Sequence, residues 1–198
     1  MGRGVMAYET FAFVYDEVMD SSLYKKWLDF SCRHLGKRKQ LLELACGTGA
    51  LAVEFAKAGF DVTGLDLSEE MLMIASQRAE KEEAAVQFVA GDMLDFVDVG
   101  TYQAITCYSD SLCYMEDEQS VQQVFDGVYS CLEEDGVFLF DVHSLYQIDE
   151  VFPFFPFFPF FPLLLLNCHQ IFCPMFLSLC RFFPFLPNCH LIFCPYVS

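Results

Sequence analysis

A glycine-rich loop followed at a fixed distance by an acid is the part of this sequence whose spacing most clearly predicts chemistry. Residues 41–66, LLELACGTGALAVEFAKAGFDVTGLD, place one apolar run before Gly47 and Gly49 and a second run that ends on Asp66. Glycines let the backbone approach a ligand closely, and an acid at the end of the next strand can accept from both hydroxyls of a ribose. Asp66 lies 19 residues after Gly47, as such a site requires. The stretch therefore predicts nucleotide-type binding.

The residues around this loop predict the elements that must position it. The short apolar run at 41–44 is typical of a buried parallel strand, residues 50–58 have helical composition, and Gly59 stands where a helix ends. Further strands are expected at residues 85–90, 102–108 and 136–142, and further helices at residues 22–35, 68–83 and 116–132. The alternation predicts an α/β fold with a Rossmann-like, doubly wound, mostly parallel sheet.

Several motifs resemble those of the class I S-adenosylmethionine (SAM) dependent methyltransferases. ELACGTG and GLDLS are similar to the first two motifs of that family. AGDML, YSDSLCYM and GVFLFDVHS resemble one group of its small bacterial members, and the resemblance covers about residues 8–152. It implies that the cofactor is SAM and that a methyl group passes to a small-molecule or otherwise unidentified acceptor.

The resemblance also implies roles for individual residues. Glu43, two residues before Ala45, is expected to orient the loop and the ammonium end of the cofactor. Asp92 is expected to accept from the adenine amino group and Met93 to pack on the ring, with a simple strand-end turn as the alternative for Asp92. Tyr8 and Tyr15 are candidates to cover the methionine end, with plain packing as the alternative for both. Asp92 and Met93 follow the strand at 85–90 directly.

Asp110 is a candidate on topological grounds, because it follows the strand at 102–108 and ligands bind at the carboxyl ends of central strands. Helix capping is the alternative for Asp110, and His143 could either face the substrate or be an ordinary strand-end residue. No catalytic residue is predicted, since the sulfonium is already activated and positioning alone supplies about 7–11 kcal/mol. The predicted cofactor-binding set is Tyr15, Glu43, Ala45, Gly47, Gly49, Asp66, Leu67, Asp92, Met93 and Asp110.

A nicotinamide dinucleotide is the alternative ligand, and a NAD-dependent oxidoreductase the alternative enzyme. Gly47, Gly49 and Ala52 also satisfy the GxGxxA pattern. A dinucleotide needs a helix N-terminus for its pyrophosphate, whereas SAM has no phosphate. Glu43 and the later motifs favour SAM. A non-catalytic SAM-binding or membrane-associated protein is a further alternative.

The composition changes abruptly near residue 150. All 28 acidic residues lie at or before Glu150 and all eight prolines after it, so the net charge of −17 belongs to the first part. We therefore expect a SAM-binding domain at residues 1–150 and a hydrophobic tail at 151–198 outside that domain. The tail has the character of a repetitive or out-of-frame stretch, and the methyltransferase pattern is expected to be truncated or frameshifted after about residue 152.

The tail and the charge also bear on partners. Two CHxxxC units, beginning at Cys168 and Cys189, match no zinc spacing, so no metal is expected. The uncharged stretch 163–180 makes membrane contact possible but disfavoured, because Pro174 interrupts it. The acidic domain makes nucleic acid an unlikely partner. Without a secretory signal at residues 1–13, the cytoplasm is the expected location.

The break has a structural consequence for the fold. The family pattern continues after its fifth strand with a helix and an antiparallel hairpin of two strands, which have no visible counterpart here. Five strands are therefore expected, with the fifth at 136–142 left as an exposed edge. We expect cofactor binding to survive this loss and acceptor binding to be impaired.

Overall fold

A computed structural model describes Met19 and residues 21–142 and 190–193 of the 198-residue chain. Tyr8, Tyr15, His143, the CHxxxC unit at Cys168 and the domain boundary near residue 150 lie outside the described residues. The strands are β1 (Gln40–Leu44), β2 (Asp61–Asp66), β3 (Val86–Ala90), β4 (Tyr102–Cys107), β5 (Leu132–Phe140) and β6 (His190–Phe193). The helices are α2 (Ser21–Leu35), α3 (Ala50–Lys57), α4 (Glu69–Lys81) and α5 (Glu118–Cys131), with short 3-10 turns η1 (Val97–Val99) and η2 (Ser111–Tyr114).

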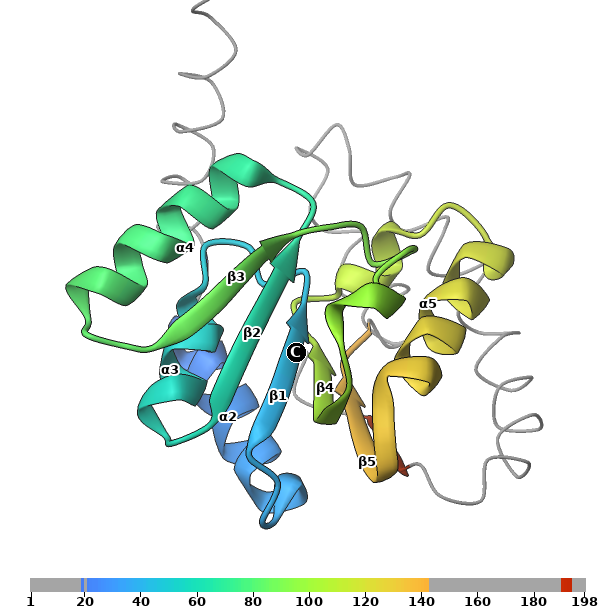
Figure 1. The fold of residues 1–198 in the computed structure, drawn as a ribbon, viewed down its shortest axis with the longest axis horizontal. Helices are drawn as coiled ribbons and strands as arrows, with labels where there is room; N and C mark the ends of the chain where they lie inside the picture. Colours follow the sequence, from blue (N-terminus) through green and yellow to red (C-terminus); the bar gives the residue numbers. More distant parts are fainter. Residues whose placement is uncertain (1–18, 20, 143–189, 194–198) are drawn as a thin grey trace, which may run out of the picture.

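The strands form one parallel sheet in the order β3-β2-β1-β4-β5-β6 (Figure 1). The chain winds outward from β1 to β2 and β3, and then returns to pair β4 with the other edge of β1. This reversal of strand order beside β1 is the topological switch point at which open α/β sheets bind ligands. The predicted α/β, Rossmann-like, doubly wound parallel sheet is confirmed.

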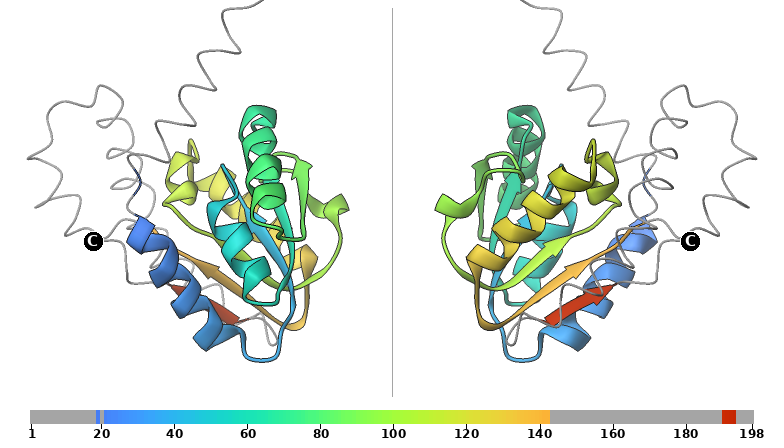
Figure 2. Two further views of the ribbon diagram at one scale, coloured as in Figure 1. Left: turned by 90° about the vertical axis from the view of Figure 1, so that its left-hand side faces the viewer. Right: turned by 90° about the vertical axis from the view of Figure 1, so that its right-hand side faces the viewer.

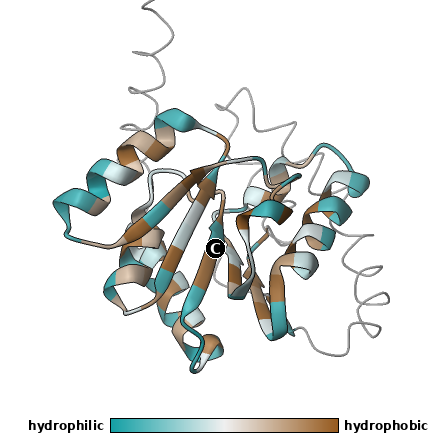
Figure 3. Cartoon of the chain, in the orientation of Figure 1, coloured by the Kyte–Doolittle hydropathy of each residue, from teal (hydrophilic) through white to brown (hydrophobic). Residues whose placement is uncertain are grey.

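Strand residues alternate between two hydrophobic layers, because successive side chains of a strand point to opposite faces of its sheet. The layer under α5 contains Leu42, Ile105 and Phe138. The opposite layer, under α2 and α3, contains the neighbouring residues Leu41, Ala104, Val137 and Leu139. Figure 3 shows the strands as the most hydrophobic part of the fold and the helices as mixed. The described part of the protein is thus a three-layer sandwich whose central strands, β1 and β4, are buried on both faces.

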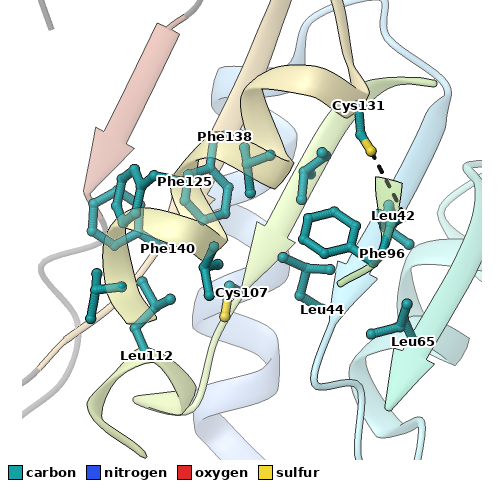
Figure 4. Close-up of a cluster of buried hydrophobic side chains, with 14 of the residues drawn as sticks. Leu42, Leu44, Leu65, Phe96, Cys107, Leu112, Phe125, Cys131, Phe138 and Phe140 are labelled. Atoms are coloured by element: carbon teal, nitrogen blue, oxygen red, sulfur yellow. Dashed lines mark hydrogen bonds between the residues drawn. The ribbon is translucent and has the colours of Figure 1, made fainter. Parts of the chain in front are cut away.

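Aromatic rings dominate the layer under α5 (Figure 4). The ring of Phe125 on α5 meets those of Phe138 and Phe140 edge to face, at centroid distances of 5.5 and 5.6 Å. Further along the helix, the Cys131 thiol lies 3.9 Å from the backbone oxygen of Phe96. These contacts fix α5 across β4 and β5, and so fix the strand ends that carry the polar residues described below.

The expectation that β5 would be an exposed sheet edge is wrong. His190–Phe193, from the predicted tail, pairs parallel with β5, and Ile192 packs partly against the layer under α2 and α3. In Figure 2, β6 (red) extends the sheet beyond β5 (orange). The physical reason is that an unpaired edge offers a row of free backbone groups that any extended apolar segment can satisfy. None of the described strands is antiparallel, so the hairpin of the family pattern does not lie among them.

The α5 layer generates a test of stability. We expect Phe125→Ala to lower the free energy of unfolding by about 3–5 kcal/mol, because it removes a buried ring and leaves a cavity. Tyr129→Ala is the matched control one turn along the same helix, where the ring is 50% exposed, and it should cost no more than about 0.5 kcal/mol. Urea denaturation of the full chain measures both. Equal costs would contradict the described packing of α5.

Candidate active site

The carboxyl ends of four strands meet at one edge of the sheet. Strand pairing places Leu44 beside Leu65 and Cys107, and Cys107 beside Phe140. The next residue along each strand therefore lies on this edge: Ala45, Asp66, Tyr108 and Asp141. This edge includes the switch point between β1 and β4, where the fold predicts a ligand.

The loop after β1 is built from alternate residues in the left-handed region. Ala45, Gly47 and Gly49 have φ values of 53°, 53° and 70°. Cys46, between the first two, donates its N–H to the Leu65 backbone oxygen at 3.0 Å and so ties the loop to β2. Gly49 faces α4 so closely that a Cβ atom there would lie 2.7 Å from that of Ala75. The loop needs Gly49 both for its conformation and for its space.

The carboxylate of Asp66 lies against this loop, as the spacing predicts. Its Oδ2 accepts from the Gly47 N–H at 2.7 Å, and its Oδ1 accepts from the Ser68 N–H at 2.9 Å. Ser68 also caps α4, its hydroxyl accepting from the Met71 N–H at 3.2 Å, which confirms the predicted cap. These bonds orient the Asp66 carboxylate at the end of β2, although its predicted contact with a ribose stays a prediction.

A small cavity of about 50 Å³ opens between the loop and the end of β4. Its walls include Glu43 and Gly47 on the β1 side and Tyr108 on the β4 side. Ala45, Trp27, Ser109 and Ser111 also line it. The volume suits a group of a few heavy atoms and not a whole nucleoside.

Glu43 is the buried acid of this cavity. It is 4% exposed, and its Oε2 atom makes no hydrogen bond among the described residues. Burial, reinforced by the charge of Asp66, raises the pKa of the Glu43 carboxyl to about 8. Burial and the charges of Glu43 and Asp66 likewise hold the pKa of the Cys46 thiol well above its usual value. At neutral pH the Glu43 carboxyl is therefore mainly protonated, and it would gain from a cationic partner.

Three further residues of the predicted cofactor-binding set, of which Asp92 and Met93 are expected to contact adenine, follow β2 and β3. Leu67 is 73% exposed, so its apolar side chain is open to a ligand. Met93 packs partly against the layer under α5. Asp92 turns the chain after β3, because its Oδ1 accepts from the Leu94 N–H at 2.9 Å. The strand-end turn is thus observed for Asp92, and the adenine contacts stay predictions.

Asp110 lies beside the cavity without lining it. It occupies the N-cap position of η2, but its side chain makes no capping hydrogen bond, so the capping alternative is not observed. Its backbone N–H donates to Asp141 Oδ1 at 2.9 Å. Burial, the charge of Asp141 and the Cys113 thiol together raise the pKa of the Asp110 carboxyl strongly. Its predicted contact with cofactor or substrate stays a prediction.

Sequence reasoning missed a polar cluster on the far side of the cavity. The ring of Trp27 on α2 stacks on that of Tyr108 at a centroid distance of 5.6 Å, and the Tyr108 and Ser31 hydroxyls are 2.7 Å apart. Asp141, wholly buried after β5, completes the cluster. The available signal for Asp141 was an acid placed directly after an apolar strand, in GVFLFDVHS. The pairing of α2 with Tyr108 had no local signal.

Two features are absent from the part of the chain that the structure describes. No three His, Cys, Asp or Glu side chains in it lie where they could jointly hold a metal ion. Its helices are also too short or too polar for any of them to cross a bilayer.

Several known proteins with similar sequences and structures are named as methyltransferases, which agrees with the fold and with the glycine-containing loop after β1. Residues 41–136 match the family model of the methyltransferase domain. The chain is 42% identical over 152 residues to a protein named as a methyltransferase in Geobacillus sp. (strain WCH70), covering 74% of this chain and 62% of that one. A similarly named protein of Bacillus subtilis (strain 168) is 40% identical, with 75% and 60% covered. The crystal structure of a SAM-dependent methyltransferase from Clostridium acetobutylicum ATCC 824 superposes with a TM-score of 0.63 at 31% identity, covering 73% of this chain and 61% of that one.

These findings define the class of the protein. Its fold, its loop after β1 and its relatives identify it as a member of the class I SAM-dependent methyltransferases. The chain spans about 60% of the length of the relatives that it matches.

The two loop glycines provide a matched test. Both have positive φ, so an alanine at either position should be strained. A Cβ at Gly47 would meet nothing within 4 Å, whereas one at Gly49 would meet Ala75. We expect Gly49→Ala to destabilise the protein by about 1–3 kcal/mol more than Gly47→Ala, because overpacking adds to the backbone strain. Thermal and urea unfolding measure the difference, and equal effects would contradict the contact between the loop and α4.

Glu43 generates a pH-dependent prediction. Its pKa is about 8 in the folded protein and 4.5 when unperturbed, so between these values the folded state holds a proton that the unfolded chain has lost. Stability from this group is therefore lost as pH rises from about 4.5 to 8, by up to about 1.4 kcal/mol per pH unit. Glu43→Gln should remove that part of the slope. Denaturation of wild type and variant from pH 5.5 to 8 tests this, and parallel pH profiles would contradict it.

Proposed function

We propose that this chain binds SAM at the carboxyl ends of β1 and β4 and transfers its methyl group to a small-molecule acceptor. The observation that carries the proposal is the cavity between the loop and Tyr108, with the buried Glu43 carboxyl in its wall and one Glu43 oxygen without a hydrogen bond among the described residues. A buried polar atom of this kind calls for a partner. The α-ammonium of SAM is a hydrogen-bond donor that is small enough for the cavity and opposite in charge to a carboxylate.

The amino-acid end of the cofactor would enter this cavity. An ammonium beside Glu43 favours the ionised carboxylate, reversing the effect of burial on its pKa. The loop at Ala45, Gly47 and Gly49 would approach the cofactor through its backbone, which has no long side chain to obstruct contact. Tyr15 is a further candidate to cover this end, and Asp110 to meet the ammonium or the acceptor.

The nucleoside would extend from the cavity along the ends of β2 and β3. Asp66 would accept from the ribose hydroxyls, and the bonds from the Gly47 and Ser68 N–H groups, which hold its carboxylate at the loop, support this role. Leu67 and Met93 would enclose the adenine ring, and Asp92 would accept from its amino group. The alternative dinucleotide finds no comparable support, because its pyrophosphate offers the buried Glu43 carboxyl no cationic partner and would be repelled by the carboxylate of Asp66.

The reaction needs positioning more than acid–base chemistry. Bound SAM would supply an activated methyl group. The lone pair of the acceptor would attack the methyl carbon while the bond from that carbon to the positively charged sulfur breaks, which would release S-adenosylhomocysteine. The edge at β1 and β4 would orient the methyl group toward the acceptor, and the aromatic rings of Trp27 and Tyr108 would exclude water behind the methionine end. An acceptor proton, where one must leave, would pass to solvent or to a nearby carboxylate.

The two acids of β2 test the binding site. We expect Asp66→Ala to weaken binding of S-adenosylhomocysteine about 10- to 100-fold, because it removes charge-assisted hydrogen bonds to the ribose. Asp61→Ala is the matched control, since Asp61 is exposed at the opposite end of the same strand and should leave affinity unchanged. Isothermal titration calorimetry on the full chain measures both.

A wild-type chain that binds neither S-adenosylhomocysteine nor SAM would contradict the proposed function. Binding that Asp66→Ala and Asp61→Ala weaken equally would contradict the placement of the ribose at the end of β2. Methyl transfer itself is tested separately, with radiolabelled SAM and a panel of small amines, phenols and carboxylates, because turnover depends on the acceptor as well as on the cofactor.

A further inference from the structure

The turn after β4 holds two consecutive residues in a conformation that costs energy. Ser109 and Asp110 have φ values of 63° and 55°, and neither is glycine. A left-handed conformation costs a residue with a side chain about 1–2 kcal/mol. Such a turn persists only where its surroundings hold it in place.

Asp141 is the residue that holds this turn. Parallel pairing sets Phe140 beside Cys107, so Asp141 lies level with Tyr108, immediately before the turn. Its Oδ1 accepts from the Asp110 N–H at 2.9 Å. Its own N–H donates to the Cys107 backbone oxygen at 3.3 Å. The side chain of Asp141 is therefore the bridge between the end of β5 and the strained turn of β4.

The turn in its held conformation forms one wall of the cavity. Ser109 and Ser111 line the cavity together with Tyr108, opposite Glu43 and Gly47. Asp141 is wholly buried and does not line the cavity. It can therefore influence a ligand there only through the residues that it holds.

Helix α2 meets the same carboxylate. Burial raises the pKa of Asp141, and the Trp27 indole on α2 is among the groups that lower it. The Trp27 ring also stacks on Tyr108, which in turn meets Ser31 of α2 through its hydroxyl. Asp141 thus lies where α2, β4 and β5 converge behind the cavity.

Several ionisable and polar groups face the carboxylate of Asp141. The groups that face it are the Asp110 carboxyl on the turn, the Cys107 thiol on β4 and the Trp27 indole on α2. Burial raises the pKa of both carboxyls, but the N–H groups of Asp110, Ser109 and Trp27 hold that of Asp141 lower. These N–H groups favour the ionised form of Asp141, whose Oδ1 accepts from the turn.

We infer that Asp141 is a positioning residue for the amino-acid end of SAM, because its carboxylate holds the Ser109–Asp110 turn that walls the cavity beside Glu43. The inference rests on the proposed function, since it requires that SAM bind there. It assigns no role in the chemical step to Asp141, which touches neither the cavity nor the reacting atoms.

Two ligands separate a positioning role from a general loss of stability. S-adenosylhomocysteine carries the amino-acid end, whereas 5′-methylthioadenosine has the same nucleoside and sulfur without it. Asp141→Leu removes the hydrogen-bond acceptor and fills the buried site with an apolar side chain of similar shape. We expect it to weaken S-adenosylhomocysteine about tenfold or more while changing the affinity for 5′-methylthioadenosine less than about threefold. Titration calorimetry on the full chain measures both affinities.

Asp141→Asn is the conservative variant, because one amide oxygen can still accept from the turn. It should recover most of the lost affinity, leaving a selective loss of about two- to fivefold for S-adenosylhomocysteine. This variant decides the matter should Asp141→Leu not fold. Cys131→Ala, a buried substitution on α5 remote from the turn, is the control for general destabilisation and should leave the ratio of the two affinities unchanged.

The outcomes are distinguishable. A wild-type chain that binds neither ligand contradicts the proposed function. A wild-type chain that binds both, with Asp141 variants that lose both affinities equally or lose neither, overturns the positioning role alone and leaves SAM binding intact.

Discussion

The structure depends on the parallel pairing of β1 with strands on both of its edges. Because β2 pairs on one edge of β1 and the chain returns from β3 to pair β4 on the other, the strand order reverses beside β1 and leaves its carboxyl end uncovered. The loop after β1 and the turn after β4 then face each other across the cavity. The site follows from the strand order, and the helices serve to keep that order in place from either face.

Negative charge concentrated at one edge of the sheet is the second constraint. Glu43, Asp66, Asp110 and Asp141 all lie there, within a chain of net charge −17. Burial raises the pKa of the Glu43 and Asp110 carboxyls, while backbone N–H groups donate hydrogen bonds to Asp66 and Asp141. Part of the negative charge at this edge of the sheet is therefore neutralised by bound protons before a cation binds. A ligand with an ammonium group and a sulfonium matches this arrangement, and a pyrophosphate does not.

Local patterns in the sequence predicted most of the fold and the loop after β1 with Asp66 beside it. Strand and helix positions followed from apolar runs and caps, and the position of Asp66 beside the loop followed from its spacing after Gly47, because the second strand ends next to that loop. The cluster around Asp141 could not be found in this way. Its contacts join Asp110 to Asp141, 31 residues apart, and Ser31 to Tyr108, 77 residues apart, and these depend on how the layers pack. The pairing of His190–Phe193 with β5 was missed for the same reason.

Proton release on ligand binding is the most direct test of whether the ammonium of the cofactor binds beside Glu43. If the ammonium of S-adenosylhomocysteine binds beside Glu43, a carboxyl with a pKa of about 8 must ionise, and at pH 7 binding should release nearly one proton. Calorimetric titration in two buffers of different ionisation enthalpy measures this number. We expect the binding enthalpy of the wild type to differ between the two buffers, and Glu43→Gln to abolish this difference. A binding enthalpy that is the same in both buffers, or a release that persists in Glu43→Gln, would contradict it.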